Sequence, residues 1–311
     1  MVQRQRGGVT ILFSLLVLTL LISVVGGVSY DMALDLRRTQ SMLYQEQARL
    51  IAVGAEGWIG NLLRDDRLDN ENDHLGELWA QPLPPLPIDG AGMSGIVSGA
   101  ITDLQGRFNL NNLLTSDGLP DEIEFARFER LLRNLGIDTQ IANAVIDWMD
   151  PDTEVRFPGG AEDDLYATRL PALKAANQFF RSADELAIIE GIDKPAFDLL
   201  RPHVVALPER TPINANTATL AILTALDDAM SANDAQEIAE QRFEQGLDDI
   251  DVAFAGLLPA ETIDTLTTET SYFQVRSVVR IGTTRFTMYS LVFRDQQGAI
   301  SVLLRTFGTP I

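Results

Sequence analysis

The sequence predicts an α+β protein: a long N-terminal transmembrane helix packed on a small antiparallel sheet, with a large all-helical insertion. Three observations predict this class. The chain opens with a long apolar run, strand-like alternation occurs near residues 93–103 and 271–307, and helical patterns fill residues 109–268 between them. Because strands that are distant in sequence can pair in one sheet, the helical block is expected to interrupt a single α+β unit.

The apolar run at residues 7–30 contains no charge, and Arg4 and Arg6 stand just before it. At a rise of about 1.5 Å per residue, residues 9–28 form a helix of about 30 Å, which matches one hydrocarbon core. The flanking arginines place the N-terminus in the cytoplasm and the bulk of the chain on the far side. An ordinary secretory signal would have a shorter apolar core followed by a cleavage site, and this run does not fit that pattern. The small residues Gly7 and Gly8 come before the apolar core. A plain one-pass anchor without any cleavage is the alternative interpretation of this segment.

The same helix is expected to continue well beyond the membrane. No proline occurs in residues 31–63, and Leu36, Leu43 and Leu50 recur at helical spacing. An apolar cluster at residues 58–63 extends this stripe, and we expect it to pack against the rest of the domain. The polar stretch at residues 70–73 ends the pattern.

The strands come from two distant parts of the chain. Residues 81–92 hold four prolines and two glycines, which indicates a stiff linker, and residues 93–103 follow as a first strand. Near the C-terminus, residues 271–281, 284–294 and 299–307 alternate apolar and polar side chains between turn residues. They predict a three-stranded antiparallel meander that joins the first strand in one sheet.

Residues 109–268 repeat a theme of helix, short turn and helix. Gly136 and Gly191 each follow an apolar helix, and Asp138 and Asp193 can cap the helices that come next. The sequence S-x-x-E that begins at Ser182 is a capping box. Further predicted features of this block are helices at residues 141–148 and 197–205 and an N-cap at Asn216.

Composition narrows the function. The net charge is −20, from 44 acidic and 24 basic residues, and cysteine is absent. Phosphate binding depends on Lys and Arg, so this acidity argues against a nucleic-acid partner. Without cysteine, disulfides, thiolate metal sites and cysteine nucleophiles are excluded.

The best candidate site is an acidic loop after Trp148, in which seven carboxylates fall within eighteen residues. Hard oxygen ligands in a flexible loop suit Ca²⁺, although the spacing is not that of an EF-hand. Residues 158–160, Pro-Gly-Gly, would let the loop fold back so that both halves share an ion. A solvated acidic loop without an ion is the alternative. The residues predicted to hold calcium are Asp150, Asp152, Glu162, Asp163 and Asp164.

No catalytic pattern is evident. His74 and His203, the two histidines, stand in unrelated contexts, and the sequence contains no G-x-S-x-G, H-E-x-x-H or P-loop motif. We therefore expect a protein that is not an enzyme and has no catalytic residues.

The N-terminus resembles the leader of type IV pilins and of type II secretion pseudopilins. It reads Arg-x-x-Gly-Gly, ending at Gly8, and Val-Thr-Ile-Leu follows from Val9. The resemblance implies that a prepilin peptidase cuts after Gly8 and methylates Val9. Most such proteins carry glutamate at the fifth mature position, where this chain has Phe13. That glutamate is thought to neutralise the N-terminal amine of a neighbouring subunit, and its absence is typical of K-type minor pseudopilins.

Further stretches extend the resemblance to K-type pseudopilins over nearly the whole chain. No single one is decisive, but their order together with the leader is specific. These stretches are residues 103–112, 145–152, 160–163 with Tyr166, 182–186 with 190–192, and 213–218.

The resemblance implies a structural role in protein secretion. The expected protein is a minor pseudopilin at the tip of the type II secretion pseudopilus, where it starts filament assembly for the export of folded proteins. Its expected partners are I- and J-type minor pseudopilins, possibly the H type, and the prepilin peptidase. It is expected to cross the bacterial inner membrane once, with its bulk in the periplasm and calcium bound in the helical block.

The main rival is a membrane-anchored helix-hairpin-helix protein that binds nucleic acid, because the turns at Gly136 and Gly191 resemble those modules. The turns lie among acids, so we expect the scaffold without the phosphate role, and no nucleic-acid partner. The expected units are a leader at 1–8, a transmembrane segment at 9–30, the rest of the N-terminal helix and the following segment at 31–80, a linker and first strand at 81–108, the inserted block at 109–268 and C-terminal strands at 269–311.

Overall fold

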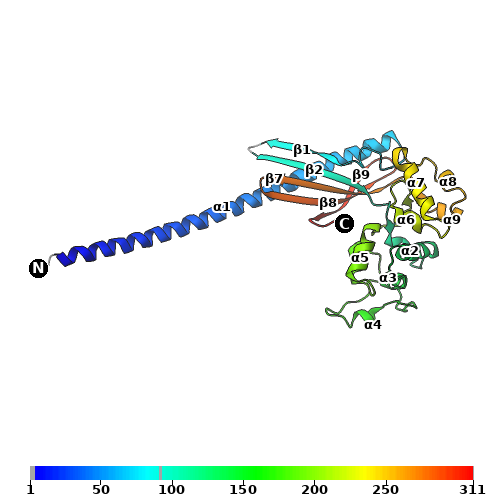
Figure 1. Ribbon diagram of the computed structural model, residues 1–311, viewed down its shortest axis with the longest axis horizontal. Helices are drawn as coiled ribbons and strands as arrows, with labels where there is room; N and C mark the ends of the chain where they lie inside the picture. The colour runs from blue at the N-terminus through cyan, green and yellow to red at the C-terminus, as the bar shows by residue number, and fades with distance from the viewer. Residues whose placement is uncertain (1–3, 91–92, 311) are drawn as a thin grey trace.

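The computed structural model describes residues 4–90 and 93–310, which form a rod, a sheet and a helical head in that order (Figure 1). The rod is α1, Arg4–Asp69, a single helix of 66 residues. Its N-terminal half projects alone, with every apolar side chain from Val9 to Tyr30 exposed. Among the described residues, α1 is the one helix long and apolar enough to cross a membrane. The predicted anchor and its long continuation are thus present in one helix.

The second half of α1 lies on one face of the sheet. Ala48, Ala52, Ile59 and Leu63 are buried at helical spacing against strand residues such as Val275. The predicted packing of the cluster at 58–63 holds only in part, because Trp58 points outward and is 51% exposed. Leu36, Leu43 and Leu50 are exposed as well. The apolar stripe therefore has one side that packs on the sheet and one that faces away from it.

The sheet has five antiparallel strands in the order β1-β2-β7-β8-β9. The predicted meander is confirmed, and residues 273–281 of its first strand pair with residues 95–103 of the strand at 93–103. The chain therefore leaves this sheet after β2 and returns to it at β7, as expected. The strands are β1 Leu83–Gly90, β2 Met93–Asp103, β7 Tyr272–Ile281, β8 Thr284–Arg294 and β9 Ile300–Phe307.

The proline-rich stretch is not a linker, so that prediction is wrong. Residues 83–90 form β1, which lies at the sheet edge and pairs only with β2. Proline has no N–H to donate, and an edge strand needs its N–H groups on one side only. The register is irregular between Leu83 and Leu86, where Pro84 and Pro85 interrupt the ladder.

The head, residues 108–267, is mostly helical, as predicted, but it also contains two short parallel ladders that were not predicted. β3 Phe108–Asn109 pairs with β4 Val204–Val205, and β5 Ile213–Asn214 pairs with β6 Leu266–Thr267. The helices are α2 Glu122–Asn134, α3 Ile141–Met149, α4 Asp163–Tyr166, α5 Lys194–Leu200, α6 Leu220–Ala225, α7 Ala232–Gln245, α8 Ile250–Ala253 and α9 Ala260–Ile263, with 3₁₀ turns at Leu110–Leu113, Ala183–Ile188 and Arg201–His203.

Local capping follows the sequence in part. Asp193 caps α5, and Ser182 with Glu185 forms the predicted capping box. The predicted cap at Asn216 is wrong, because its buried amide bonds to the backbone of Leu247 and Thr219 caps α6 instead. The helix predicted at 197–205 ends at residue 200. Residues 204 and 205, the last two of the predicted range, form β4 instead.

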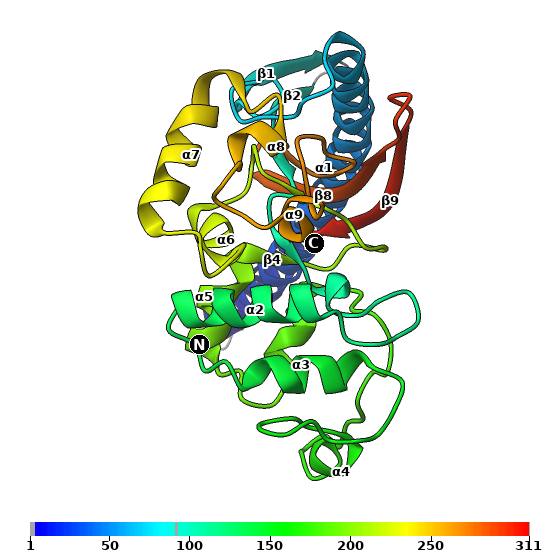
Figure 2. The same cartoon turned by 90° about the vertical axis from the view of Figure 1, so that its right-hand side faces the viewer.

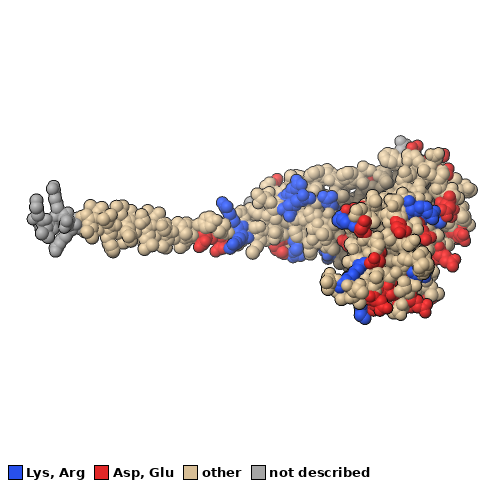
Figure 3. Space-filling model, turned by 60° about the horizontal axis from the view of Figure 1, so that its bottom comes forward, with Lys and Arg blue, Asp and Glu red and all other residues tan. Residues whose placement is uncertain are grey.

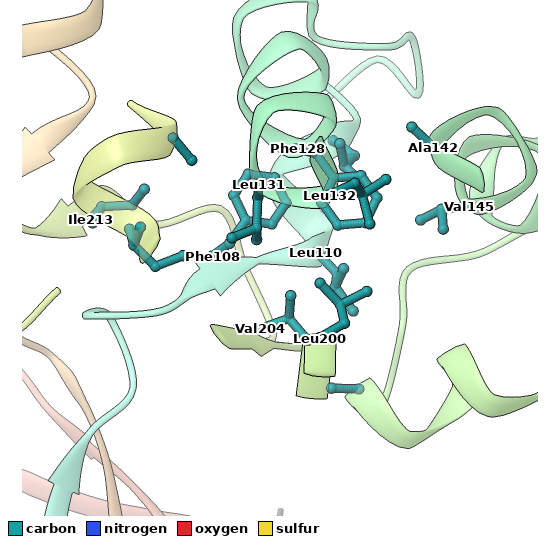
Figure 4. Close-up of a cluster of buried hydrophobic side chains, with 14 of the residues drawn as sticks. Phe108, Leu110, Phe128, Leu131, Leu132, Ala142, Val145, Leu200, Val204 and Ile213 are labelled. Carbon is teal, nitrogen blue, oxygen red and sulfur yellow. The ribbon is translucent and has the colours of Figure 1, made fainter. Parts of the chain in front are cut away.

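The core of the head forms around α2. Phe128, Leu131 and Leu132 point from one face of this helix toward Phe108 and Val204 on the β3–β4 ladder (Figure 4). Phe108 and Phe128 stack with ring centroids 5.3 Å apart. The ladder thus gives α2 a surface to pack on, and α3 covers the other side of this core (Figure 2).

A buried ionic network joins the rod, the sheet and the head. Arg294 of β8 donates to Asp66 Oδ2 and to the carbonyl oxygens of Leu63 and Thr270, each at 3.0 Å, and it also pairs with Asp73. These groups come from the end of α1, from the connection that follows it, from the segment before β7 and from the sheet. Asn214 of the head joins the network by donating to the Asp73 carbonyl at 3.1 Å. Because an unpaired buried charge is costly, the network holds the three parts in one arrangement.

Candidate metal centre

The acidic loop lies at the end of the head, between α3 and α4 (Figure 2). It folds back at Pro158-Gly159-Gly160, as predicted, and Gly160 N donates to the Arg156 carbonyl at 2.9 Å. A Cβ on Gly160 would collide with Asp147 Oδ2 and with the backbone of Arg156. Glycine at this position therefore lets the second half of the loop reach the end of α3.

This fold brings three of the predicted ligands together. Asp150, Asp152 and Glu162 each place a carboxylate oxygen within 4.8 Å of the others. Asp150 and Glu162 are each only 4% exposed, whereas Asp152 faces solvent. The group is all oxygen, partly open, and drawn from both halves of the loop, which is the donor set that Ca²⁺ prefers.

Several oxygens in this group have no donor. Asp150 Oδ1 and both oxygens of Glu162 are buried without a hydrogen bond. No Lys or Arg in the described part of the chain forms an ion pair with either residue, and Arg156 is directed to Asn143 Oδ1 at 3.3 Å. A buried carboxylate without a partner is costly, and a cation would remove that cost. The residues present therefore fit a bound Ca²⁺.

The pKa values of these carboxyl groups are raised by their burial and by their mutual repulsion. Burial, with repulsion from Asp152 and Asp147, raises the pKa of Asp150 to about 6. Burial, with repulsion from Asp147 and Asp150, raises the pKa of Glu162 to about 7. Each carboxylate thus disfavours ionisation of the others, as expected where several like charges lie together without a cation.

Asp147 lies beside this group, close enough to raise the pKa values of Asp150 and Glu162, and the predicted ligand set omits it. It is fully buried, and while Oδ2 accepts from Arg156 N at 3.1 Å, Oδ1 has no donor. Burial raises its pKa. One signal could have found it: Asp147 and Asp150 are three residues apart at the end of a predicted helix, a spacing that places two side chains on one face.

Asp163 and Asp164 were predicted as ligands but lie outside the group. Asp163 Oδ1 accepts from Ala175 N at 2.9 Å, and its other oxygen lies 3.3 Å from Lys174 Nζ. Asp164 is exposed in the first turn of α4. Asp163 therefore bonds to the loop that follows α4, and Asp164 faces solvent.

A second acidic group, Asp66, Asp73 and Glu77, also brings its oxygens together. Arg294 already binds two of its members, Asp66 and Asp73. Glu77 accepts from Trp79 Nε1 and from Asn70 Nδ2, each at 2.6 Å. In contrast to the loop carboxylates, each member of this group therefore has a positively charged or N–H partner.

The hairpin turns that suggested nucleic-acid binding are where the sequence places them. Gly136 and Gly191 both have positive φ, at 72° and 82°. One acidic side chain lies at each turn: Asp138 accepts from Gln140 N, and Glu190 pairs with Arg169. Asp138 would repel a phosphate at the first turn, and at the second Glu190 already holds the neighbouring Arg169.

The predicted processing site lies in the first turns of α1. Gly8 and Val9 are both exposed there, and Val9 begins the apolar run. Phe13, four residues further, is also exposed. This end of α1 contacts no other part of the described chain.

Comparison with known proteins identifies the family. Two family models, both described as type II secretion system protein K, match residues 106–209 and 213–276. Type II secretion system protein K of Pseudomonas aeruginosa is 33% identical over 98% of this chain and 94% of its own length. The corresponding protein of Aeromonas hydrophila is 31% identical over 98% of both chains.

A solved structure has the same fold. One chain in the crystal structure of the GspK-GspI-GspJ complex from the type 2 secretion system of enterotoxigenic Escherichia coli superposes with a TM-score of 0.76 and 27% identity. The match covers 88% of this chain and 99% of that one. The anchor helix, the sheet and the inserted head together make this chain a member of the type II secretion system protein K family, a minor pseudopilin of the secretion machinery.

Proposed function

We propose that this minor pseudopilin caps the tip of the secretion pseudopilus and starts its assembly, so that folded proteins are exported across the outer membrane. The observation that carries the proposal is the shape of the molecule. The head stands at the far end of α1 and extends sideways from the sheet (Figure 1). A subunit of this width would block the stacking of another sheet above it.

The residue at position 13 supports the same placement. In a filament, an acid there would offset the N-terminal amine of the neighbouring subunit in an apolar core, where an unpaired charge is expensive. Phe13 offers no such charge. A subunit at the top has no neighbour above that requires it.

Copy number tests the tip placement. Pseudopili isolated from cells should contain this chain at about one copy per filament, far below the major pseudopilin, as counted by quantitative mass spectrometry. Copies in proportion to filament length would contradict the proposal, because they would place the chain in the shaft.

The chain's expected partners are the I- and J-type minor pseudopilins, possibly with the H type. The related chain above was crystallised with two such proteins, and the outward side of α1 offers the apolar residues that helix packing needs. Native mass spectrometry of the co-expressed proteins should give a complex with one copy of each. Recovery of this chain alone under those conditions would count against the assignment.

Processing at Gly8 would leave α1 on the mature protein and remove Arg4 and Arg6. We propose cleavage by the prepilin peptidase, methylation of Val9, and an orientation across the inner membrane with the bulk in the periplasm. Gly8→Ala should leave the leader attached. A mature N-terminus at Val9 in that variant, read by mass spectrometry, would refute the processing site.

We also propose that the acidic loop holds calcium through Asp150, Asp152 and Glu162, with Asp147 beside them. The unpartnered buried oxygens support this assignment. A bound Ca²⁺ would supply the positive charge that lets these carboxylates stay ionised and the loop stay folded. Chelation should lower the melting temperature of the full chain in detergent, and an identical melt with and without chelator would remove the proposal.

A further inference from the structure

A cleft of about 440 Å³ opens where the head meets the outer face of the sheet, which is the face away from α1. The sheet lines it with Arg276 and Tyr289, and the connections in the head line it with Arg107 and Arg201. Of the lining residues in the described part of the chain, only Asp184 is acidic, and it binds Arg201 Nε at 2.6 Å. The cleft is therefore positive in a chain of net charge −20.

Arg107 is one of the residues that line this cleft. Its side chain is half-buried, and burial together with repulsion from Arg201 lowers its pKa. The nearest acid, Asp103, is engaged by Thr217, by Asn214 and by Gln105 N. Within the described residues Arg107 forms no ion pair, so its charge is free to meet an anion.

A stripe of arginines leaves the cleft along the sheet. Arg276 and Arg280 lie on the outer face of β7, and Arg285 of β8 is directly opposite Arg280. Like charges directly opposite in a sheet are destabilising. In the part of the chain that the structure describes, none of the three arginines has an acidic partner. The face shown in Figure 3 has basic side chains over the sheet and most acidic ones over the head.

The spacing favours an extended ligand over a single small anion. Arg276 and Arg280 are four residues apart, which is about 13 Å along a strand. A phosphate or a single carboxylate could meet one end of the stripe only. A peptide with several carboxylates matches its length.

Lipid and nucleic acid fit less well. The turn after Arg280 lies against Tyr44 on α1, about 21 Å beyond the end of the apolar run at Tyr30. That is about two and a half Debye lengths at physiological salt, so a membrane surface would attract these arginines only weakly. A nucleic-acid strand carries negative charge along its whole length and would continue past the stripe over residues 109–268, which hold 30 acidic against 11 basic side chains. A short acidic peptide segment can end within the stripe. We propose that the cleft and the arginine stripe bind an extended, carboxylate-rich peptide segment of a protein partner.

Peptide binding to the full chain in zwitterionic detergent micelles tests this site. The probe is a fluorescent peptide of alternating Glu and Ser, followed by anisotropy at low and at physiological salt. Arg107→Gln combined with Arg276→Gln should weaken binding by about tenfold, with the larger loss at low salt. Because Arg107 is half-buried, Arg276→Gln alone is the second variant. Arg276 is exposed, and its loss should weaken binding by about threefold without changing the melting temperature.

Arg37→Gln is the matched control, since it removes one exposed positive charge from α1 and leaves the cleft intact. It should bind the peptide as the unmodified chain does. Equal binding by the Arg276→Gln and Arg37→Gln variants would overturn the proposal. So would equal affinity for a peptide with Gln in place of Glu, or tighter binding of a single-stranded oligonucleotide of the same charge.

Discussion

Glu162 is a buried carboxylate whose surroundings favour a counter-ion. Neither of its oxygens has a donor, and Asp147 and Asp150 both repel it. Glu162→Gln should leave the calcium-free chain as stable or more stable, because it removes one of three like charges. The same change should abolish most of the rise in melting temperature that calcium produces. Asp164→Asn, at an exposed residue outside the group, should keep the full calcium response. Loss of the response in both variants, or in neither, would contradict the ligand assignment.

The raised pKa values give this site a pH dependence with a definite sign. Asp150 and Glu162 titrate near 6 and 7 in the calcium-free fold, but near 4 when unfolded. Between these limits the folded state holds more protons, so the stability of the calcium-free chain falls as the pH rises from about 4 to 7. Calcium competes with those protons. The calcium-dependent shift in melting temperature should therefore be larger at about pH 7.5 than at about pH 5.5. Equal shifts at both pH values would be inconsistent with this site.

Two arginines on opposite faces of the sheet, Arg285 on the outer face and Arg305 on the face toward α1, should respond in opposite ways to removal of their charge. Arg285→Gln relieves the repulsion with Arg280 directly opposite, so unfolding free energy should rise by about 0.5 kcal/mol. Arg305 instead donates to Glu56 at 2.7 and 2.9 Å. Arg305→Gln should destabilise the chain by about 1–3 kcal/mol, because Glu56 is buried. Urea unfolding in detergent measures both, and a loss of stability in Arg285→Gln would show that the repulsion is not significant.

At the scale of elements, one side of α1 packs on the sheet and the other is exposed. Leu63 is fully buried against the sheet, whereas Leu50 is 58% exposed. Leu63→Ala should cost about 2–5 kcal/mol of unfolding free energy by leaving a cavity. Leu50→Ala should change it by no more than about 0.5 kcal/mol. Assembly with co-expressed I- and J-type partners should show the opposite ranking. There Leu50→Ala should weaken the complex more than Leu63→Ala does. A stable, fully assembled Leu50→Ala complex would assign the partner surface elsewhere.

The sheet shows what pattern recognition can and cannot predict for an element. β2, β7, β8 and β9 follow from alternation and turn residues, because those signals are local and each strand has one buried face. β1 carries the opposite signal, since proline disfavours strands in general. Only its position at the sheet edge makes the strand possible. That position depends on β2 and α1, which no local pattern in residues 83–90 reveals.

At the scale of the whole molecule, Arg294 joins residues more than two hundred positions apart. It contacts Leu63, Asp66 and Asp73 from β8. Arg294→Met should cost about 3–5 kcal/mol, because it leaves two acids at the junction without their partner. Hydrogen exchange should show the head and the sheet opening separately in this variant. If they still open together, the network does not couple them.

The sequence by itself determined the membrane anchor, the order of the elements, most of the sheet and the region of the candidate site. These features rest on periodicity, capping and composition, which act over a few residues and can be read locally. The tertiary structure alone decided which carboxylates meet, that Asp147 lies beside them while Asp163 and Asp164 have other partners or face solvent, and that arginines line a cleft beside the head. Such contacts depend on where a loop folds back and on how distant segments pack, and the chain's local preferences do not encode those distances.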